Sequence, residues 1–254
     1  MRRPTLIAAY LTAIAVTAFP APAFGAIDLD DPNLFGPGEG WDRPADLAPG
    51  DSGPWVIRLQ ERLAAAGFRP GPFDGVYGKA TLGAVYAFQK VNDLERDGVF
   101  DTEDWKVLDA AQPIQLPPSE DEPDRVEVDL ERQVLYLVVD NQVEVVLPVS
   151  SGNGEFYRGR GGSWVRARTP EGSFRFTRRI DGWRISYLGA LYRPFYFRGG
   201  YAIHGSPSVP PHPASHGCVR VENHDMDYLV TRLTIGMPIH IYGDQLDRAE
   251  LFEI

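Results

Sequence analysis

The stretch of sequence that decides both fold and chemistry is His204-Gly205-Ser206-Pro207, followed after a proline-rich loop by Ser215-His216-Gly217-Cys218-Val219-Arg220. Cys218 is the only cysteine among the 254 residues. A thiol attacks a carbonyl as its thiolate, and a free thiol is mostly protonated at neutral pH, so it needs a base or a cation nearby. His204 ends a predicted strand, and the loop brings the chain back to the cysteine. The pattern therefore predicts a nucleophilic cysteine activated by an imidazole.

Two other interpretations of this segment are open. A lone cysteine can also be a buried, inert side chain or form an intermolecular disulfide. The other interpretation is a zinc site, because three histidines and the cysteine lie within 15 residues, namely His204, His212, His216 and Cys218. The segment lacks the paired spacing typical of zinc ligands, and its prolines restrict the closure of four ligands around an ion. We therefore expect no metal and no other cofactor.

The residues around Cys218 also predict how a reacting carbonyl would be held. Gly217 lets the backbone approach closely and turn, which exposes successive N–H groups for an oxyanion hole. Asn223 is expected to cap a short helix that Gly236 ends, and the positive end of this helix would favour a thiolate. The predicted inner side of this helix is apolar, with Met226, Leu229, Val230 and Leu233.

The sequence upstream of this segment has the period of two that is typical of strands. Val126, Val128 and Leu130 alternate with charged residues, and two further apolar runs follow, 134–138 and 143–149. We interpret these runs as an antiparallel β-meander with one buried face. Thr169–Phe174 is expected to turn into another strand, and further strands are predicted at Tyr201–Ile203 and Pro238–Tyr242.

The second half of the chain resembles the L,D-transpeptidase catalytic domain of the YkuD type, over about residues 125–243. Ser215–Arg220 matches the signature of that family at every position, and Thr169-Pro170-x-Gly172-x-Phe174 matches an upstream turn. The spacer between the His-Gly pair and the cysteine is shorter than in many members, which leaves the pocket shape open. The resemblance implies a mainly β sandwich with a short helix after the cysteine.

The resemblance also implies roles for individual residues. Cys218 would be the nucleophile and His204 its base, with the carbonyl of Gly205 orienting the imidazole. Three residues would support the site or its oxyanion hole, namely Ser215, His216 and Gly217. Arg220 would position a substrate carboxylate or the loop itself. Whether a tyrosine completes the oxyanion hole is open, and the sequence does not choose among Tyr187, Tyr192, Tyr196 and Tyr201.

The activity implied by this resemblance is a two-step reaction on peptidoglycan. Cys218 would attack the L,D bond of a stem tetrapeptide, release D-alanine, and pass the acyl group to a diamino-acid amine, giving a 3→3 cross-link. Water as acceptor would make the protein an L,D-carboxypeptidase. Other classes are a non-catalytic wall-binding scaffold and a cysteine protease. Carbapenems are expected to acylate the cysteine. The net charge of −10 disfavours nucleic acid and anionic membranes as partners.

The first half of the chain predicts a small three-helix domain. One helix is expected from Pro54 to Gly67, a second over about Ala80–Val91, and a third from an Asp101 cap with Trp105 and Leu108 buried. Asp74-Gly75-Val76-Tyr77 and Asp97-Gly98-Val99-Phe100 repeat one turn pattern. These motifs resemble the peptidoglycan-binding domain type 1 over residues 49–112. Wall binding and a purely architectural role are both open.

The remaining segments predict export and connection. Residues 1–25 combine Arg2-Arg3, an apolar run from Leu6 to Phe19 and small residues near Gly25, which is typical of a cleaved signal peptide. The mature protein would then lie in the periplasm or cell wall with no membrane anchor. Residues 26–48 and the proline-rich, acidic residues 113–124 are expected to be linkers. Residues 244–254 form a predicted C-terminal tail.

Overall fold

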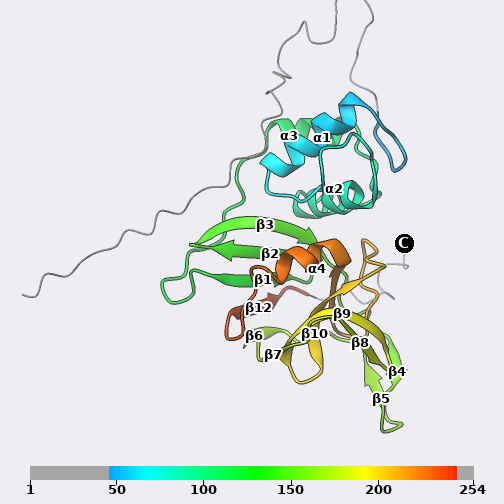
Figure 1. Ribbon diagram of the computed structural model, residues 1–254, viewed down its shortest axis with the longest axis vertical. Coiled ribbons are helices and arrows are strands. Elements are labelled where there is room, and N and C mark those ends of the chain that lie inside the picture. The colour runs from blue at the N-terminus through cyan, green and yellow to red at the C-terminus, as the bar shows by residue number, and fades with distance from the viewer. Residues whose placement is uncertain (1–45, 245–254) are drawn as a thin grey trace, which may run out of the picture. The chain divides into compact units, whose positions relative to one another are not determined.

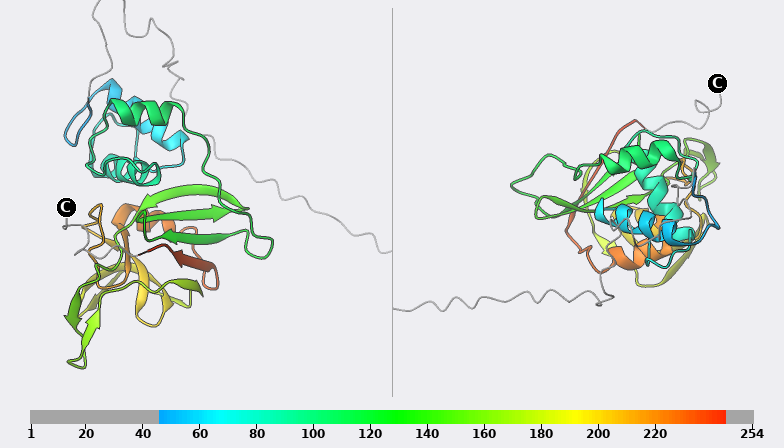
Figure 2. Two further views of the ribbon diagram at one scale, coloured as in Figure 1. Left: turned by 180° about the vertical axis from the view of Figure 1, so that it is seen from behind. Right: turned by 90° about the horizontal axis from the view of Figure 1, so that it is seen from above.

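The computed structural model describes residues 46–244, and the predicted signal peptide and most of the C-terminal tail lie outside them. Three helices come first: α1 (Pro54–Ala65), α2 (Lys79–Val91) and α3 (Thr102–Asp109). They lie close to their predicted positions and are grouped together in Figure 2. α3 begins with the predicted capping box, in which the Asp101 side chain accepts hydrogen bonds from the N–H groups of Glu103 and Asp104. None of the helices in residues 46–244 has the length and apolar character to span a membrane.

In each copy of the repeated turn, a buried glutamine side chain forms hydrogen bonds with the turn. Gln60 on α1 donates to Asp74 Oδ1 and Val76 O, and its Oε1 accepts from Gly75 N–H. Gln89 on α2 makes the equivalent bonds to Asp97, Val99 and Gly98. The internal repeat is therefore a packing device, in which one amide side chain satisfies the backbone of one tight turn.

The remainder of the described chain is a β-sandwich (Figure 1). One sheet has the order β3-β2-β1-β12-β6, and the second has the order β11-β10-β9-β7 with β8 paired to β9. A small hairpin, β4-β5, stands apart from both sheets. The strands of the first sheet are β1 (Arg125–Asp129), β2 (Val134–Val139), β3 (Gln142–Pro148), β6 (Gly172–Arg175) and β12 (Pro238–Tyr242). The others are β4 (Phe156–Arg158), β5 (Trp164–Arg166), β7 (Arg178–Arg179), β8 (Trp183–Ser186), β9 (Gly189–Arg198), β10 (Tyr201–Ser206) and β11 (Val219–Glu222).

The prediction that the meander buries only one face is wrong for β2. Leu135 and Leu137 face the core between the two sheets, whereas Tyr136 and Val138 on the opposite face pack into the core of the helical part. The helical part is also joined to β3, because Val146 N–H donates to Gly67 O at 2.9 Å. The alternation in the sequence therefore reflects two cores on either side of one sheet. β1 also pairs in parallel with β12, which a pure meander does not predict.

The helix after the cysteine differs from its prediction at both ends. α4 spans Asn223–Leu229, so it stops well before Gly236. Asn223 is its first residue rather than its cap, and its Oδ1 is buried without a hydrogen bond. The four residues of β11 separate Cys218 from this helix, a distance of roughly 13 Å along an extended strand. The helix end therefore does not stabilise the thiolate. Met226, Leu229 and Leu233 are buried as predicted, and Val230 is partly buried.

Both predicted linkers are tied to the folded parts where the structure describes them. Leu47 is buried and pairs with Phe100 through two backbone hydrogen bonds. In the proline-rich segment, Glu122 forms ion pairs with Arg175 and His240 of the sandwich. At least one acidic residue of this segment therefore attaches it to the sandwich.

Replacing Gln89 with alanine is expected to lower the free energy of unfolding by about 1–3 kcal/mol, because the buried Gly98 N–H and Asp104 carboxylate lose a partner. Gln60→Ala should have a similar effect through Gly75. Urea denaturation followed by circular dichroism measures both changes. The exposed Gln115→Ala serves as a control and should stay within about 0.5 kcal/mol of the parent. If all three variants were equally stable, the amide clamps would not hold the turns.

Candidate active site

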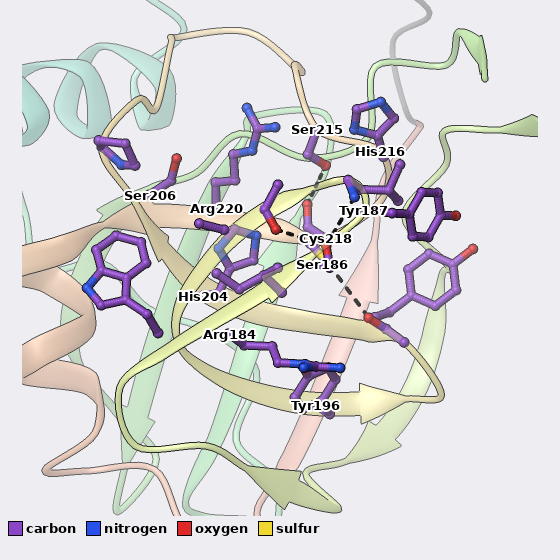
Figure 3. Close-up of a pocket in the computed structure, with 18 of the residues that line it drawn as sticks. Arg184, Ser186, Tyr187, Tyr196, His204, Ser206, Ser215, His216, Cys218 and Arg220 are labelled. Carbon is purple, nitrogen blue, oxygen red and sulfur yellow. Dashed lines mark hydrogen bonds between the residues drawn. The ribbon is translucent and has the colours of Figure 1, made fainter. Parts of the chain in front are cut away.

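The candidate residues are brought together by the parallel pairing of β10 with β11. In this pairing His204 lies opposite Arg220, and Ile203 lies opposite Val219. Side chains alternate between the two faces of a sheet, so the buried Ile203 and Val219 point into the sandwich core. His204 and Arg220 point to the other face, together with Cys218, which directly precedes β11. All three line one cavity (Figure 3).

Hydrogen bonds within the segment Ser215–Cys218 fix its shape. Ser215 Oγ donates to Cys218 O at 2.6 Å and accepts from Gly217 N–H at 2.9 Å. Thr169 Oγ1 donates to the Gly217 carbonyl at 2.9 Å, so the predicted upstream turn reaches the segment Ser215–Cys218. Gly217 has a φ of +126°, and a Cβ there would lie 2.7 Å from the Tyr201 ring and 2.8 Å from Arg168 O. Only glycine fits this position.

The predicted oxyanion role of the Gly217 N–H does not agree with the structure. That N–H already donates to Ser215 Oγ, so it is occupied inside the segment. Ser215 N–H is occupied as well, because it donates to Ser151 O at 2.8 Å. Sequence reasoning expected a row of exposed N–H groups, but a turn this tight uses several of its donors to hold itself together.

The charges of His204 and Cys218, which line the same cavity, follow from their burial and their neighbours. His204 Nδ1 lies 2.9 Å from Gly205 O, the contact that the resemblance implied, and this leaves Nε2 as the basic atom. Burial and, to a smaller extent, the nearby positive charge of Arg220 lower the pKa of His204 to about 4, opposed by the hydrogen bond to the Gly205 backbone. Burial also raises the pKa of the Cys218 thiol, opposed by a hydrogen bond from the backbone of Ala202 and by Arg220. At neutral pH the pair is therefore a thiol beside an uncharged imidazole rather than the standing thiolate that the sequence suggested.

The cavity beside this pair has a volume of about 780 Å³ and a cationic lining. Three arginines contribute to it, namely Arg178, Arg184 and Arg220, and no aspartate or glutamate among residues 46–244 lines it. Arg178 stacks on the Tyr196 ring at 3.7 Å. None of the three arginines forms an ion pair within the described chain, whereas Arg132, Arg175 and Arg193 all do. The protein as a whole has a net charge of −10, so a concentration of arginines without ion pairs distinguishes the cavity from the rest of the molecule.

Only some of the tyrosines and histidines named in the sequence prediction line the cavity. Tyr187, Tyr196 and Tyr201 line the cavity, but Tyr192 does not, because its hydroxyl is bonded to Asp227. His216 lines the cavity with an exposed ring that stands edge-on to Tyr157 at 4.8 Å. His212 does not line it. Among residues 46–244, no three metal-ligating side chains are grouped closely enough to hold an ion.

Sequence reasoning missed Tyr157, Arg178 and Arg184. They come from β4, β7 and β8, which are between 34 and 61 residues before the cysteine in the chain. Their strands are short, and no local motif marks them. The only available signal was the number of arginines between 158 and 198, which is high for an acidic protein.

Comparisons with known proteins identify the families of the two folded parts. The L,D-transpeptidase catalytic domain profile matches residues 123–241, and the putative peptidoglycan binding domain profile matches residues 52–108. A solved L,D-transpeptidase from Xylanimonas cellulosilytica is 43% identical with a TM-score of 0.75, covering 79% of this chain and 99% of that one. An L,D-transpeptidase from Stackebrandtia nassauensis is 22% identical with a TM-score of 0.46, covering 79% and 97%.

A relative outside this class matches a shorter stretch of the chain. A probable N-acetylmuramoyl-L-alanine amidase from Bacillus licheniformis is 41% identical over 68 residues, which are 26% of this chain and 19% of the relative. This chain thus spans about a fifth of that curated protein. The fold and the matches thus define a class of protein in which a putative peptidoglycan binding domain precedes a β-sandwich with a cysteine loop beside a strand histidine. The chain belongs to the L,D-transpeptidase family.

The raised thiol pKa predicts how Cys218 reacts with iodoacetamide. Since only the thiolate is alkylated, the rate constant should be low at neutral pH and should keep rising as the pH passes about 9, the ordinary value for a thiol. Intact-mass spectrometry across a pH series measures it, with glutathione as the reference thiol. His204→Ala should leave the position of this rise nearly unchanged. A constant rate between pH 5 and 8 that disappears in His204→Ala would instead show a preformed thiolate–imidazolium pair.

Proposed function

We propose that the protein is a peptidoglycan L,D-transpeptidase in which Cys218 is the nucleophile and His204 is the general base. The observation that carries the proposal is the placement of Cys218, His204 and Arg220 on one face of the β10–β11 pair, opening into the cationic cavity. Family membership supports the general reaction class. Export to the cell wall follows from the same proposal, because its substrate lies there.

In the first half of the reaction, the uncharged Cys218 thiol and the uncharged His204 imidazole act together on the substrate. As Cys218 Sγ attacks the carbonyl of the L,D bond, its proton passes to His204 Nε2, so no standing thiolate is needed. The tetrahedral intermediate then collapses, the C–N bond breaks, and His204 returns the proton to the departing D-alanine amine. A thioester on Cys218 remains. The hydrogen bond from His204 Nδ1 to Gly205 O keeps Nε2 directed at the reacting atoms.

In the second half, an amine replaces the sulfur. The side-chain amine of a diamino acid on a second stem attacks the thioester carbonyl, His204 accepts a proton from it, and the thiol is regenerated. The product is a 3→3 cross-link. For the oxyanion we place the Cys218 backbone N–H and the hydroxyls of Tyr157 and Tyr201 at the carbonyl oxygen, since Gly217 N–H is occupied. Ser215 and His216 support the segment and the cavity wall.

The charge of the cavity supports a substrate with several carboxylates. A stem tetrapeptide carries a terminal carboxylate and side-chain carboxylates, and arginine binds such groups through two parallel hydrogen bonds. Arg220 would hold the carboxylate nearest the scissile bond, while Arg184 and Arg178 would hold those farther along the stem. The alternative acceptor, water, would make the protein an L,D-carboxypeptidase with the same acyl-enzyme. The peptidoglycan-binding domain would raise the local concentration of both stems.

Incubation with tetrapeptide muropeptides should produce 3→3 linked dimers and free D-alanine, separated and identified by mass spectrometry. Cys218→Ala should yield neither product, because no thioester can form. A carbapenem should add once to the wild-type protein, at Cys218, as a mass increase. Tripeptide without dimer would support the carboxypeptidase alternative. No product and no adduct with folded protein would contradict the proposed activity and favour a wall-binding scaffold.

Substituting Arg184 with glutamine is expected to raise KM for a tetrapeptide roughly 10-fold, because a charge-assisted hydrogen bond to a carboxylate contributes about 1.5–3 kcal/mol. Amidating the diamino-acid carboxylate of the substrate should raise KM of the wild type by a similar factor and leave KM of Arg184→Gln nearly unchanged. Arg179→Gln is the matched control, since Arg179 adjoins Arg178 on β7 but does not line the cavity. Equal KM values for free and amidated substrates would contradict carboxylate recognition.

A further inference from the structure

Lys90 has the most unusual environment of any lysine in the described chain. It lies on α2 in the helical part, its side chain is completely buried, and Nζ donates to Gln133 O and Val149 O of the sandwich, both at 3.1 Å. Lys79 and Lys106, by contrast, are exposed and pair with carboxylates. No carboxylate in residues 46–244 pairs with Lys90. Burying an amine beside two carbonyls alone is costly, so it needs a structural reason.

The two carbonyls that Lys90 holds begin a chain of hydrogen bonds. Gln133 is fully buried, its Nε2 donates to Ser151 Oγ at 2.7 Å, and its Oε1 accepts from Ser151 N–H at 2.8 Å. Val149 N–H donates to Gln133 O at 2.9 Å, so the two residues that Lys90 contacts are also hydrogen-bonded to each other. Burial lowers the pKa of Lys90 well below its ordinary value.

The chain of hydrogen bonds continues into the catalytic segment. Ser151 O accepts from both Ala214 N–H and Ser215 N–H, at 3.0 and 2.8 Å. Ser150 forms a pair of backbone hydrogen bonds with Arg220, each 3.1 Å long. The residues Val149–Asn153 therefore run alongside Ser215–Arg220 and hold it at several points, and Lys90 fastens the first residue of that run.

We propose that Lys90 is a positioning residue for the catalytic segment, and that the peptidoglycan-binding domain thereby contributes to turnover as well as to wall binding. The inference rests on the proposed function, since turnover is one of its two readouts. Without the Lys90 contacts, Gln133 and Val149 lose a shared donor, Ser151 is held less firmly, and Cys218 departs from its alignment with His204. A misalignment of about 1 Å is enough to lower a rate by up to roughly 100-fold.

The test compares Lys90→Met with Lys106→Met in the full chain. Methionine fills a similar volume without a donor, and Lys106 lies on α3 in the same helical part but is exposed. With a soluble tetrapeptide, which needs no wall binding, kcat of Lys90→Met is expected to fall about 10- to 100-fold while KM changes less than about threefold. Lys106→Met should match the wild type in both constants.

Amide hydrogen exchange supplies the second readout. Exchange at residues 150–152 and 214–220 should accelerate at least about 10-fold in Lys90→Met, while exchange in β1 and β12 should stay as in the wild type. A folded Lys90→Met with unchanged kcat and unchanged exchange would overturn the proposal, and so would a lower melting temperature with wild-type kcat. If the wild type itself did not turn over the tetrapeptide, the proposed function would fail, and hydrogen exchange alone would then decide the role of Lys90.

Discussion

The structure depends on one pairing, the parallel alignment of β10 with β11. Its register places Ile203 and Val219 in the sandwich core, and the apolar burial of that face fixes which residues appear on the other. A slip of β11 by one residue would turn Cys218 and Arg220 into the core and expose the apolar Val219. The same hydrophobic packing that stabilises the sandwich therefore selects the geometry of the active site, and no interaction between the thiol and the imidazole is needed to bring them together.

Burial has opposite consequences for the two partners of this site. It raises the pKa of the thiol and lowers that of the imidazole, so both groups are uncharged at rest. Arg220 acts on both in the same direction, because a positive charge favours a thiolate and disfavours an imidazolium. The transfer of a proton from Cys218 to His204 creates two charges in a partly buried place. In the proposed reaction that cost would be lowest when a substrate carboxylate neutralises Arg220 and a carbonyl oxygen takes up the negative charge, so charge separation would be coupled to substrate binding.

Local patterns predicted the parts of the fold that local interactions determine. The three helices, the capping box at Asp101 and the two tight turns follow from periodicity and turn chemistry, and the Ser215–Arg220 motif pointed to the site. Features set by tertiary packing were not predictable. The second core on the far face of β2 required knowledge that the helical part covers it, and Asn223 resembled a cap because only the structure shows where β11 ends. Arg178 and Arg184 reach the cavity from short strands that carry no motif.

Several contacts between the helical part and the sandwich involve residues that lie close to Ser215–Arg220. Arg69 pairs with the buried Asp225 at the start of α4, and Lys79 pairs with Glu222 at the end of β11 while donating to Pro207 O. Lys90 fastens the run beside Ser215. A domain that served only as a tether would need no buried contacts with its neighbour, since a flexible linker suffices for tethering. Lys79 contacts the ends of β10 and β11, Arg69 contacts the start of α4, and Lys90 contacts the run beside Ser215, so the helical part belongs to the framework of the candidate site. Under the proposed function, recognition of the polymer and alignment of Cys218 would occur in a single folded unit.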